Sequence, residues 1–150
     1  MKAEQTAYVG TISPPFTFDS YDASKPNAYV VELWVHWDND KVRGFKWVDS
    51  NQKEYTYADV NFSSDKVSTC KFRPGETLKS AALWQSSYGY GSWRGFEFTT
   101  SAGVEFSAGN LGDAAKSPLD VDGATLLSFF GGTNPDNFMQ GIGLWVGRPS

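Results

Sequence analysis

The sequence has little of the two residue types that most often bind metals or form covalent cross-links. Cys70 is the one cysteine and His36 the one histidine in the 150-residue chain. A single cysteine excludes a disulfide within the chain, and a structural zinc site draws its ligands mainly from cysteine and histidine. His36 lies in an alternating segment beside Trp34, so we interpret it as a packed or surface residue rather than a catalytic one.

The chain also lacks a basic segment and a long apolar run. Its net charge is −4 and no stretch concentrates lysine or arginine, which argues against nucleic acid as a partner. The apolar runs are too short for a transmembrane segment. The N-terminal residues contain no apolar signal segment, so we expect a cytoplasmic protein or one released by a non-classical route.

Helical periodicity is absent, because no stretch repeats apolar residues at helical spacing over three turns. Residues 31–37 alternate instead, with apolar side chains at every second position. Aromatic residues make up 16% of the chain, which also has 15 glycines and 7 prolines, a composition typical of strands and turns. The sequence therefore predicts a single all-β domain over residues 1–150.

A six-residue motif occurs three times, at residues 42–47, 93–98 and 139–144. Each copy reads apolar, polar, glycine, apolar, any residue, apolar, and the motif glycines are 51 and 46 residues apart. A turn and an apolar run precede each copy, so each unit is predicted as turn, strand, loop, strand. Repetition at this spacing predicts one structural unit used three times around a shared core.

The polar residue of each motif, Arg43, Arg94 or Gln140, begins a core-facing apolar row, because side chains two apart share a face of a strand. Such a residue is best placed at the end of the strand, where its polar atoms reach water or a ligand. The alternative is that these residues only cap the ends of the core. The glycine that follows faces outward and lets another backbone or a ligand approach closely.

The loops before the three motifs differ in chemistry. Residues 38–41 are short and charged and are predicted to form a plain hairpin turn. Residues 86–92 combine Tyr88 and Tyr90 with glycine and serine, and residues 131–138 combine glycines, amides, a carboxylate and an aromatic ring. Such groups suit a neutral polyhydroxyl ligand, which needs forked donors and acceptors and a ring face. Ordinary turns have the same composition, so that alternative stays open.

Residues 126–146 resemble the carboxy-terminal signature of the jacalin-related lectins, and residues 72–76 and 93–103 are similar to the middle of that family. The resemblance covers residues 6–147 in order and spacing, with a cadence similar to that of animal zymogen-granule lectins. It implies a β-prism I fold of three four-stranded Greek-key sheets with pseudo-threefold symmetry, in agreement with the threefold motif. It also implies a single lectin domain that binds carbohydrate reversibly, with no cofactor and no catalysis.

In that family the sugar occupies a shallow site at one end of the prism, where a carboxy-terminal G-x-x-x-D loop supplies backbone amides and an aspartate. Aligned on Ile142, this loop corresponds to Asp136, Asn137, Phe138, Met139 and Gln140. Gln140 stands where the family has aspartate, and glutamine lacks the charge that strengthens hydroxyl binding. The stretch from Gly132 to Asp136 also fits the motif, four residues earlier in the chain, so Asp136 is the alternative source of the carboxylate.

The resemblance draws the remaining walls of the site from two other segments. Residues 8–16 are similar to the family's N-terminal segment with its glycine cluster reduced to Gly10, and Ser13 is the expected backbone contact. Tyr88 and Tyr90 would form the neighbouring wall that selects among sugars. Because uncut chains of this family usually favour mannose or glucose, the expected partners are mannose-type glycans or glycoproteins.

The sequence leaves other functions open and also suggests how the chain assembles. A protein-interaction or pore-associated prism without sugar binding is the main alternative, since the aspartate and the glycine cluster are altered. Glu97 and Glu105 could flank a glycosidic bond, although glycosidases usually have deeper clefts. Residues 120–123 match a fragment of a calcium loop without its other ligands and are interpreted as a turn, so no metal is expected. Weak single sites gain from multivalency, which predicts a homodimer with Trp34 as a candidate contact.

Overall fold

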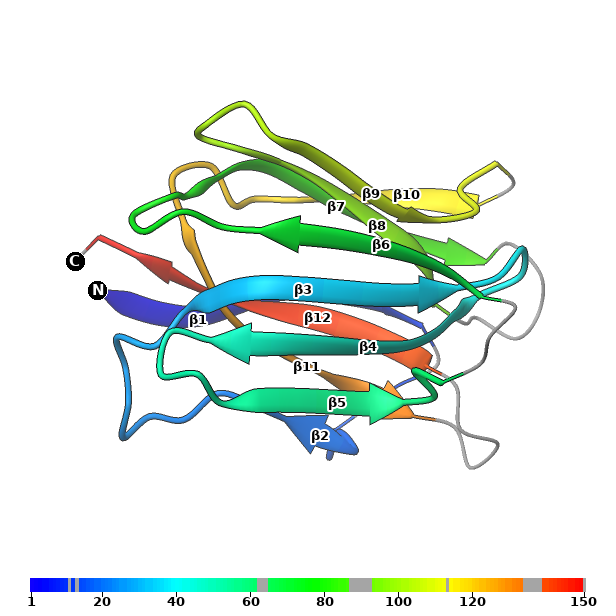
Figure 1. The fold of residues 1–150 in the computed structure, drawn as a ribbon, viewed down its shortest axis with the longest axis horizontal. Helices are drawn as coiled ribbons and strands as arrows, with labels where there is room; N and C mark the ends of the chain where they lie inside the picture. Colours follow the sequence, from blue (N-terminus) through cyan, green and yellow to red (C-terminus); the bar gives the residue numbers. More distant parts are fainter. Residues whose placement is uncertain are drawn as a thin grey trace.

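A computed structural model describes residues 1–10, 12, 14–61, 65–86, 93–112, 114–133 and 139–149. Within these residues the secondary structure consists of twelve β-strands, and no helix that could cross a membrane is present. The strands form three four-stranded antiparallel sheets that surround one core as the faces of a prism (Figure 1). This arrangement confirms the predicted all-β architecture.

Sheets 1 and 2 each come from one continuous stretch of chain. Sheet 1 contains β3 (Val30–Trp37), β4 (Val42–Asp49), β5 (Glu54–Ala58) and β6 (Lys66–Lys71), in the order β5-β4-β3-β6. Sheet 2 contains β7 (Leu78–Ser86), β8 (Trp93–Thr100), β9 (Glu105–Gly109) and β10 (Ala114–Leu119), in the order β10-β7-β8-β9. In both sheets the first three strands pair in succession and the fourth returns to pair with the first, which is a Greek-key connection. The sequence repeat is therefore a repeat of topology.

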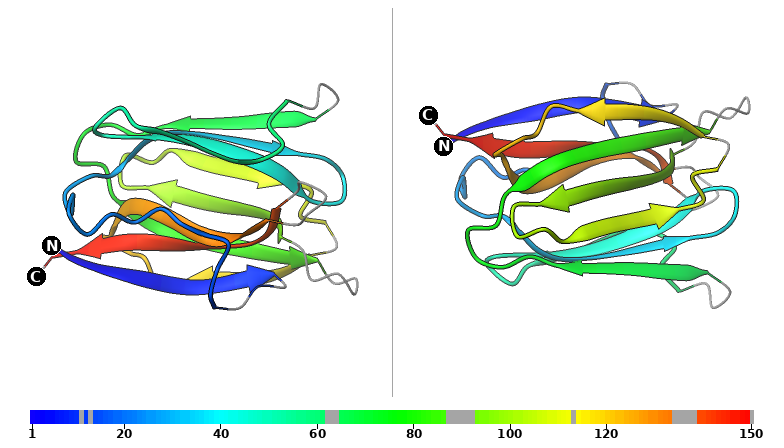
Figure 2. Two further views of the ribbon diagram at one scale, coloured as in Figure 1. Left: turned by 90° about the horizontal axis from the view of Figure 1, so that it is seen from below. Right: turned by 90° about the horizontal axis from the view of Figure 1, so that it is seen from above.

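Sheet 3 is assembled from the two ends of the chain. It contains β1 (Lys2–Gly10), β2 (Phe18–Asp19), β11 (Thr125–Thr133) and β12 (Met139–Arg148), in the order β1-β12-β11-β2. Counted from β11, with β1 and β2 as its third and fourth strands, this sheet has the same order as the other two. Lys2 faces Arg148 across β1 and β12, so both termini lie at one end of the prism (Figures 1 and 2).

The three motif strands, β4, β8 and β12, supply the centre of the core. Their inward rows are Phe45 and Trp47, Phe96 and Phe98, and Ile142 and Leu144, each at most 3% exposed. Phe45 lies where the sheets meet, with its ring centroid 5.8 Å from that of Trp93 on β8 and 5.1 Å from that of Phe129 on β11. Both pairs are edge-on, a favourable geometry for aromatic rings. One phenylalanine thus connects all three sheets.

Each motif glycine faces a residue of the outer strand whose backbone is left-handed. The facing pairs are Gly44 with Ala58 (φ 60°), Gly95 with Gly109 (φ 102°) and Gly141 with Gly10 (φ 103°). A Cβ atom on any of the three motif glycines would lie 2.1–2.5 Å from a backbone carbonyl oxygen of that outer segment. The glycine is therefore required because another backbone approaches it, which is one of the two reasons expected from the sequence.

The prism has two unlike ends. The odd-numbered strands β1, β3, β5, β7, β9 and β11 all run toward the end opposite the termini, which we call the loop end (Figure 1). The other end, where the chain starts and finishes, is the terminal end. The segments predicted to bind sugar follow β1, β7 and β11, so all three begin at the loop end.

Candidate functional site

Most of the predicted sugar-binding residues lie outside the described residues. These are Ser13, Tyr88, Tyr90, Asp136, Asn137 and Phe138. The described part of the candidate site therefore consists of the strand ends that flank them. Three residues of the prediction belong to those strand ends, namely Gly132, Met139 and Gln140.

The three described residues differ in what they offer to a ligand. Gly132 pairs with Gly141 and is covered by Ile12, whose Cγ2 would lie 2.6 Å from a Cβ added to Gly132. Met139 begins β12 with a side chain that is 0% exposed, so it belongs to the core. Gln140 is half-buried at the start of β12. Of these three, only Gln140 has a side chain with surface available to a ligand at the loop end.

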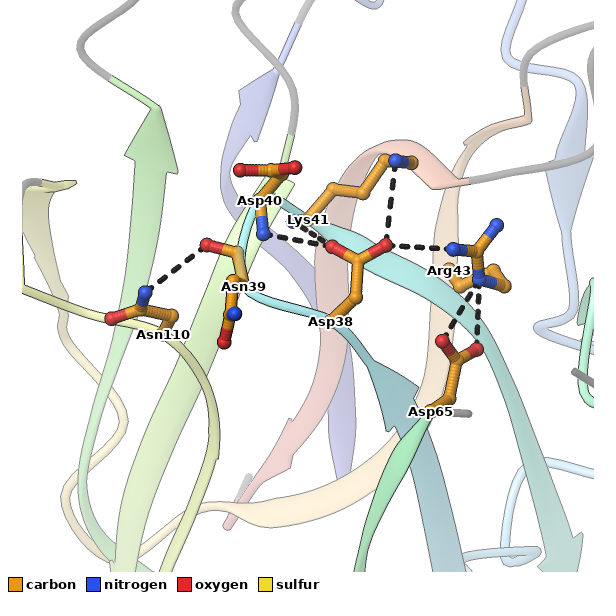
Figure 3. A network of polar contacts seen from close by, with 7 residues as sticks. All are labelled: Asp38, Asn39, Asp40, Lys41, Arg43, Asp65 and Asn110. Carbon is orange, nitrogen blue, oxygen red and sulfur yellow. Dashed lines mark hydrogen bonds and ion pairs between the residues drawn. The ribbon is translucent and has the colours of Figure 1, made fainter. Parts of the chain in front are cut away.

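The β3–β4 turn is held by its own side chains (Figure 3). The carboxylate of Asp38 accepts hydrogen bonds from the backbone N–H of Asp40 at 2.8 Å and of Lys41 at 3.0 Å. Arg43 donates to Asp38 Oδ2 at 2.7 Å, and its Nε lies 2.8 Å from Asp65 Oδ2. Partial burial opposes ionisation of Asp38, but these N–H donors and the charges of Lys41 and Arg43 outweigh it and lower its pKa. The predicted hairpin turn is confirmed, and its carboxylate is already engaged.

Arg94 plays a corresponding part in the second unit. Its side chain is 7% exposed, and its Nε donates a hydrogen bond to the carbonyl oxygen of Asn110 at 2.8 Å. Asn110 in turn donates from Nδ2 to the carbonyl oxygen of Asn39 at 3.1 Å, which joins the β9–β10 connection to the β3–β4 turn (Figure 3). Both motif arginines therefore brace loops at the end of the core, as the capping alternative predicted.

The acidic pair considered for catalysis lies on the outer face of sheet 2. Glu97 faces Ser107 and Glu105 faces Thr99, so the two carboxylates occupy neighbouring strands in a groove of about 610 Å³. Lys116 Nζ is 3.1 Å from Glu97, and Glu105 is exposed. Glu97 therefore has an ion-pair partner, whereas Glu105 faces solvent.

Two further segments behave as ordinary structure. Residues 120–123 form the turn before β11, in which Ala124 N–H donates to the Val121 carbonyl at 2.8 Å and Gly123 has φ 81°. Among the described residues, no group of three or more His, Cys, Asp or Glu could hold a metal ion. His36 is half-buried on the outer face of β3, where burial lowers its pKa against the opposing charges of Asp65 and Asp59.

Trp34, the candidate dimer contact, is not an open apolar surface. Its side chain is half-buried, and Lys46 Nζ lies 4.9 Å from the centroid of its ring. Lys46 is also ion-paired with Glu54 at 2.8 Å. A lysine positioned over an indole face covers it and keeps it compatible with water. The homodimer remains a prediction, without support from this residue.

The chain resembles known proteins in structure, but its sequence matches no known family. No protein-family model matches the chain, and no curated protein matches it significantly. The crystal structure of a lamprey immune protein matches with a TM-score of 0.76 and 22% identity, over 95% of this chain and 44% of that one. Malaysian banana lectin matches with a TM-score of 0.72 and 13% identity, over 99% of this chain and 100% of that one. A mannose-binding jacalin-related lectin from Ananas comosus matches with a TM-score of 0.68 and 13% identity, and the match covers 96% of each chain.

A fourth structure, PirB, matches with a TM-score of 0.73 and 10% identity, and this chain spans 39% of its length. The chain thus spans less than half of two of these proteins and nearly the whole of the two lectins. Jacalin-related mannose-binding lectins are therefore among its structural neighbours. At these identities the likeness establishes the fold, which is the β-prism I expected from the sequence.

Proposed function

We propose that the chain is a non-enzymatic lectin that binds mannose-type glycans reversibly at its loop end. The observation that carries this proposal is the match to mannose-binding lectins over almost the full length of both chains, with TM-scores of 0.68 to 0.71. The position of the strand ends supports it, because the segments named from the sequence all start at one end of the prism.

The binding groups assigned to this site come from the β11–β12 connection. Gln140 offers a half-buried amide that both donates and accepts, and Asp136 is the alternative source of a carboxylate. Asn137, Phe138 and the backbone of Met139 complete the proposed loop contacts. A shallow site for one sugar buries little surface. The dissociation constant should therefore be on the order of millimolar, which corresponds to a binding free energy of about −4 kcal/mol.

Glycan-array binding tests the site most directly. We expect wild-type protein at high surface density to bind mannose-type glycans, and Asp136→Ala or Gln140→Ala to weaken that binding at least tenfold. Asp122→Ala is the matched control, because Asp122 is an exposed carboxylate in a turn at the terminal end. Unchanged binding in both loop variants would remove the site assignment, and a flat array from wild type would remove the sugar specificity.

A protein-interaction module without sugar binding is the second candidate. It is favoured by two neighbours in which the matched region is less than half of a longer chain, the lamprey immune protein and PirB. A flat glycan array together with capture of protein or membrane in a pull-down would support this candidate. Release of reducing sugar from a polysaccharide would contradict both proposals and indicate a hydrolase.

Avidity would require more than one sugar site per particle, and pairing of two copies is the proposed route. Light scattering measures the mass in solution, where we expect twice the chain mass of 16.5 kDa. A strictly monomeric protein with one site would contradict this route.

A further inference from the structure

The outer face of sheet 2 contains a groove that the loop-end site does not use. Its volume is about 610 Å³, and its lining residues belong to β7, β8, β9 and β10. Figure 2 (right) shows these four strands side by side as one sheet. Small side chains such as Ala82 and Ser107 face outward along these strands and keep the floor low. Glu97, Glu105 and Lys116 also line it. A volume of this size is in the range that holds a small organic ligand.

Over the two central strands of the groove, the available polar groups belong to side chains. β7 pairs with both β8 and β10, and β8 pairs with both β7 and β9, so the backbone donors and acceptors of the two central strands are used by the sheet. What remains is the hydroxyl groups of Ser80, Thr99 and Ser107 with the carboxylates. A peptide lying over the two central strands would find no free backbone to pair with, whereas the hydroxyls of a sugar would meet hydroxyl and carboxylate partners.

The charges of the groove are unbalanced. Lys116 Nζ is already engaged, at 3.1 Å from Glu97 and 5.6 Å from the centroid of the Trp84 ring. Glu105 is exposed and has no ion-pair partner among the described residues. The groove therefore has one carboxylate more than it has cations. Charge complementarity favours a ligand that brings a positive group to Glu105.

We infer that this groove binds a short oligosaccharide carrying free amino groups, such as an oligomer of glucosamine. The ammonium group pairs with Glu105, and ring hydroxyls meet Thr99 and Ser107. The pair at Glu105 is exposed to solvent, so binding is weak and salt screens it. The site is independent of the loop end, and its occupancy does not depend on mannose recognition.

Titration of the wild-type protein with glucosamine trimer, followed by NMR amide shifts, tests the inference. We expect shifts at residues of β8 and β9, a dissociation constant in the millimolar range, and at least a threefold loss of affinity for Glu105→Gln. Glu54→Gln is the matched control: Glu54 is an exposed carboxylate on sheet 1 that is paired with a lysine, as Glu97 is on sheet 2. This control should bind as wild type does.

Three comparison ligands decide what the groove recognises. The N-acetylated trimer lacks the ammonium groups and should bind at least threefold more weakly, so equal binding would overturn the role of charge. Trilysine carries the charge without the sugar, and binding as tight as that of glucosamine trimer would overturn the sugar assignment. Mannotriose should shift loop-end resonances only. Amino-sugar shifts confined to the loop end would remove the groove as a site, while absent mannotriose shifts would count against the loop-end proposal alone.

Discussion

At the scale of single residues, Asp38 is the clearest case of a side chain that fixes a turn. It accepts two backbone hydrogen bonds and pairs with Arg43, and its pKa lies below the usual 3.8. Its ionised form therefore stabilises the folded state above the unfolded pKa, and this contribution is lost as pH falls through the folded pKa.

Replacing the Asp38 carboxylate tests whether its contribution to stability falls as the pH is lowered. We expect Asp38→Ala to lower the free energy of unfolding by about 1–3 kcal/mol at neutral pH. Urea denaturation at about pH 7 and at about pH 3 measures the difference, which should shrink at the lower pH. Asp122→Ala serves as the control with little effect at either pH. An equally large gap at both pH values would contradict an electrostatic origin.

Cys70 gives a second prediction at this scale. Its side chain is 7% exposed, and burial, together with the charge of Glu76, raises its pKa to about 11. Because the thiolate is the reactive form, the native protein should react with a thiol reagent at about pH 8 far more slowly than the same protein in urea. Equal rates in both solutions would show that the thiol is accessible in the folded state.

At the scale of elements, the pairing of each motif glycine with a left-handed residue predicts substitutions of opposite sign. Gly95→Ala places a Cβ 2.1 Å from the Ala108 carbonyl oxygen and should destabilise the fold by about 2–4 kcal/mol. Ala58 has φ 60°, which glycine adopts without strain, so Ala58→Gly should be neutral or stabilising by up to about 1 kcal/mol.

Thermal or urea unfolding of the two variants measures both effects. The threefold arrangement also supplies a control, because Gly109 occupies in sheet 2 the place of Ala58 in sheet 1. A Cβ on Gly109 would lie 2.2 Å from the Arg94 carbonyl oxygen, so Gly109→Ala should destabilise where alanine at 58 is tolerated. A destabilised Ala58→Gly variant would mean that chain entropy outweighs backbone strain at this position.

The sequence predicted the elements better than it predicted their partners. The alternation of residues 31–37 and the motif at 42–47 identify β3 and β4, because burial on one face leaves a period of two. The return of β1 to pair with β12 left no local pattern, since those residues are brought together only by the whole fold. Met139 is both the first residue of the third motif and part of the loop that the resemblance implies, and the structure places it at the start of β12 with its side chain in the core.

The roles of polar side chains were harder to predict for the same reason. Arg43 and Arg94 could be placed at strand ends, but their partners, Asp65 and the Asn110 carbonyl, belong to other connections. A sequence shows the charge of an arginine and not which loop will fold back to meet it. The groove on sheet 2 was likewise invisible, because it depends on how small and large side chains of four strands combine.

At the scale of the whole molecule, β1 closes the prism and buries Val9, which is 4% exposed. Removing residues 1–10 would uncover the edge of β12 and part of the core. We expect this truncation to lose cooperative thermal unfolding and to aggregate, as followed by circular dichroism and light scattering. A synthetic peptide of residues 1–10 added in excess should restore part of the transition. A truncated chain that melts as wild type does would show that β1 is dispensable.

Lys2 and Arg148 are paired neighbours, so the two ends of the chain could be joined and the chain opened elsewhere without changing the fold. Antiparallel neighbours are about 5 Å apart at Cα, so a brief glycine-serine bridge would fuse head to tail. Opening the chain instead between β4 and β5, at residues 50–53, would produce a circular permutant that keeps every strand pair. In that permutant the four strands of sheet 3 would follow one another along the chain. Sheet 1 would instead be assembled from the two ends of the chain.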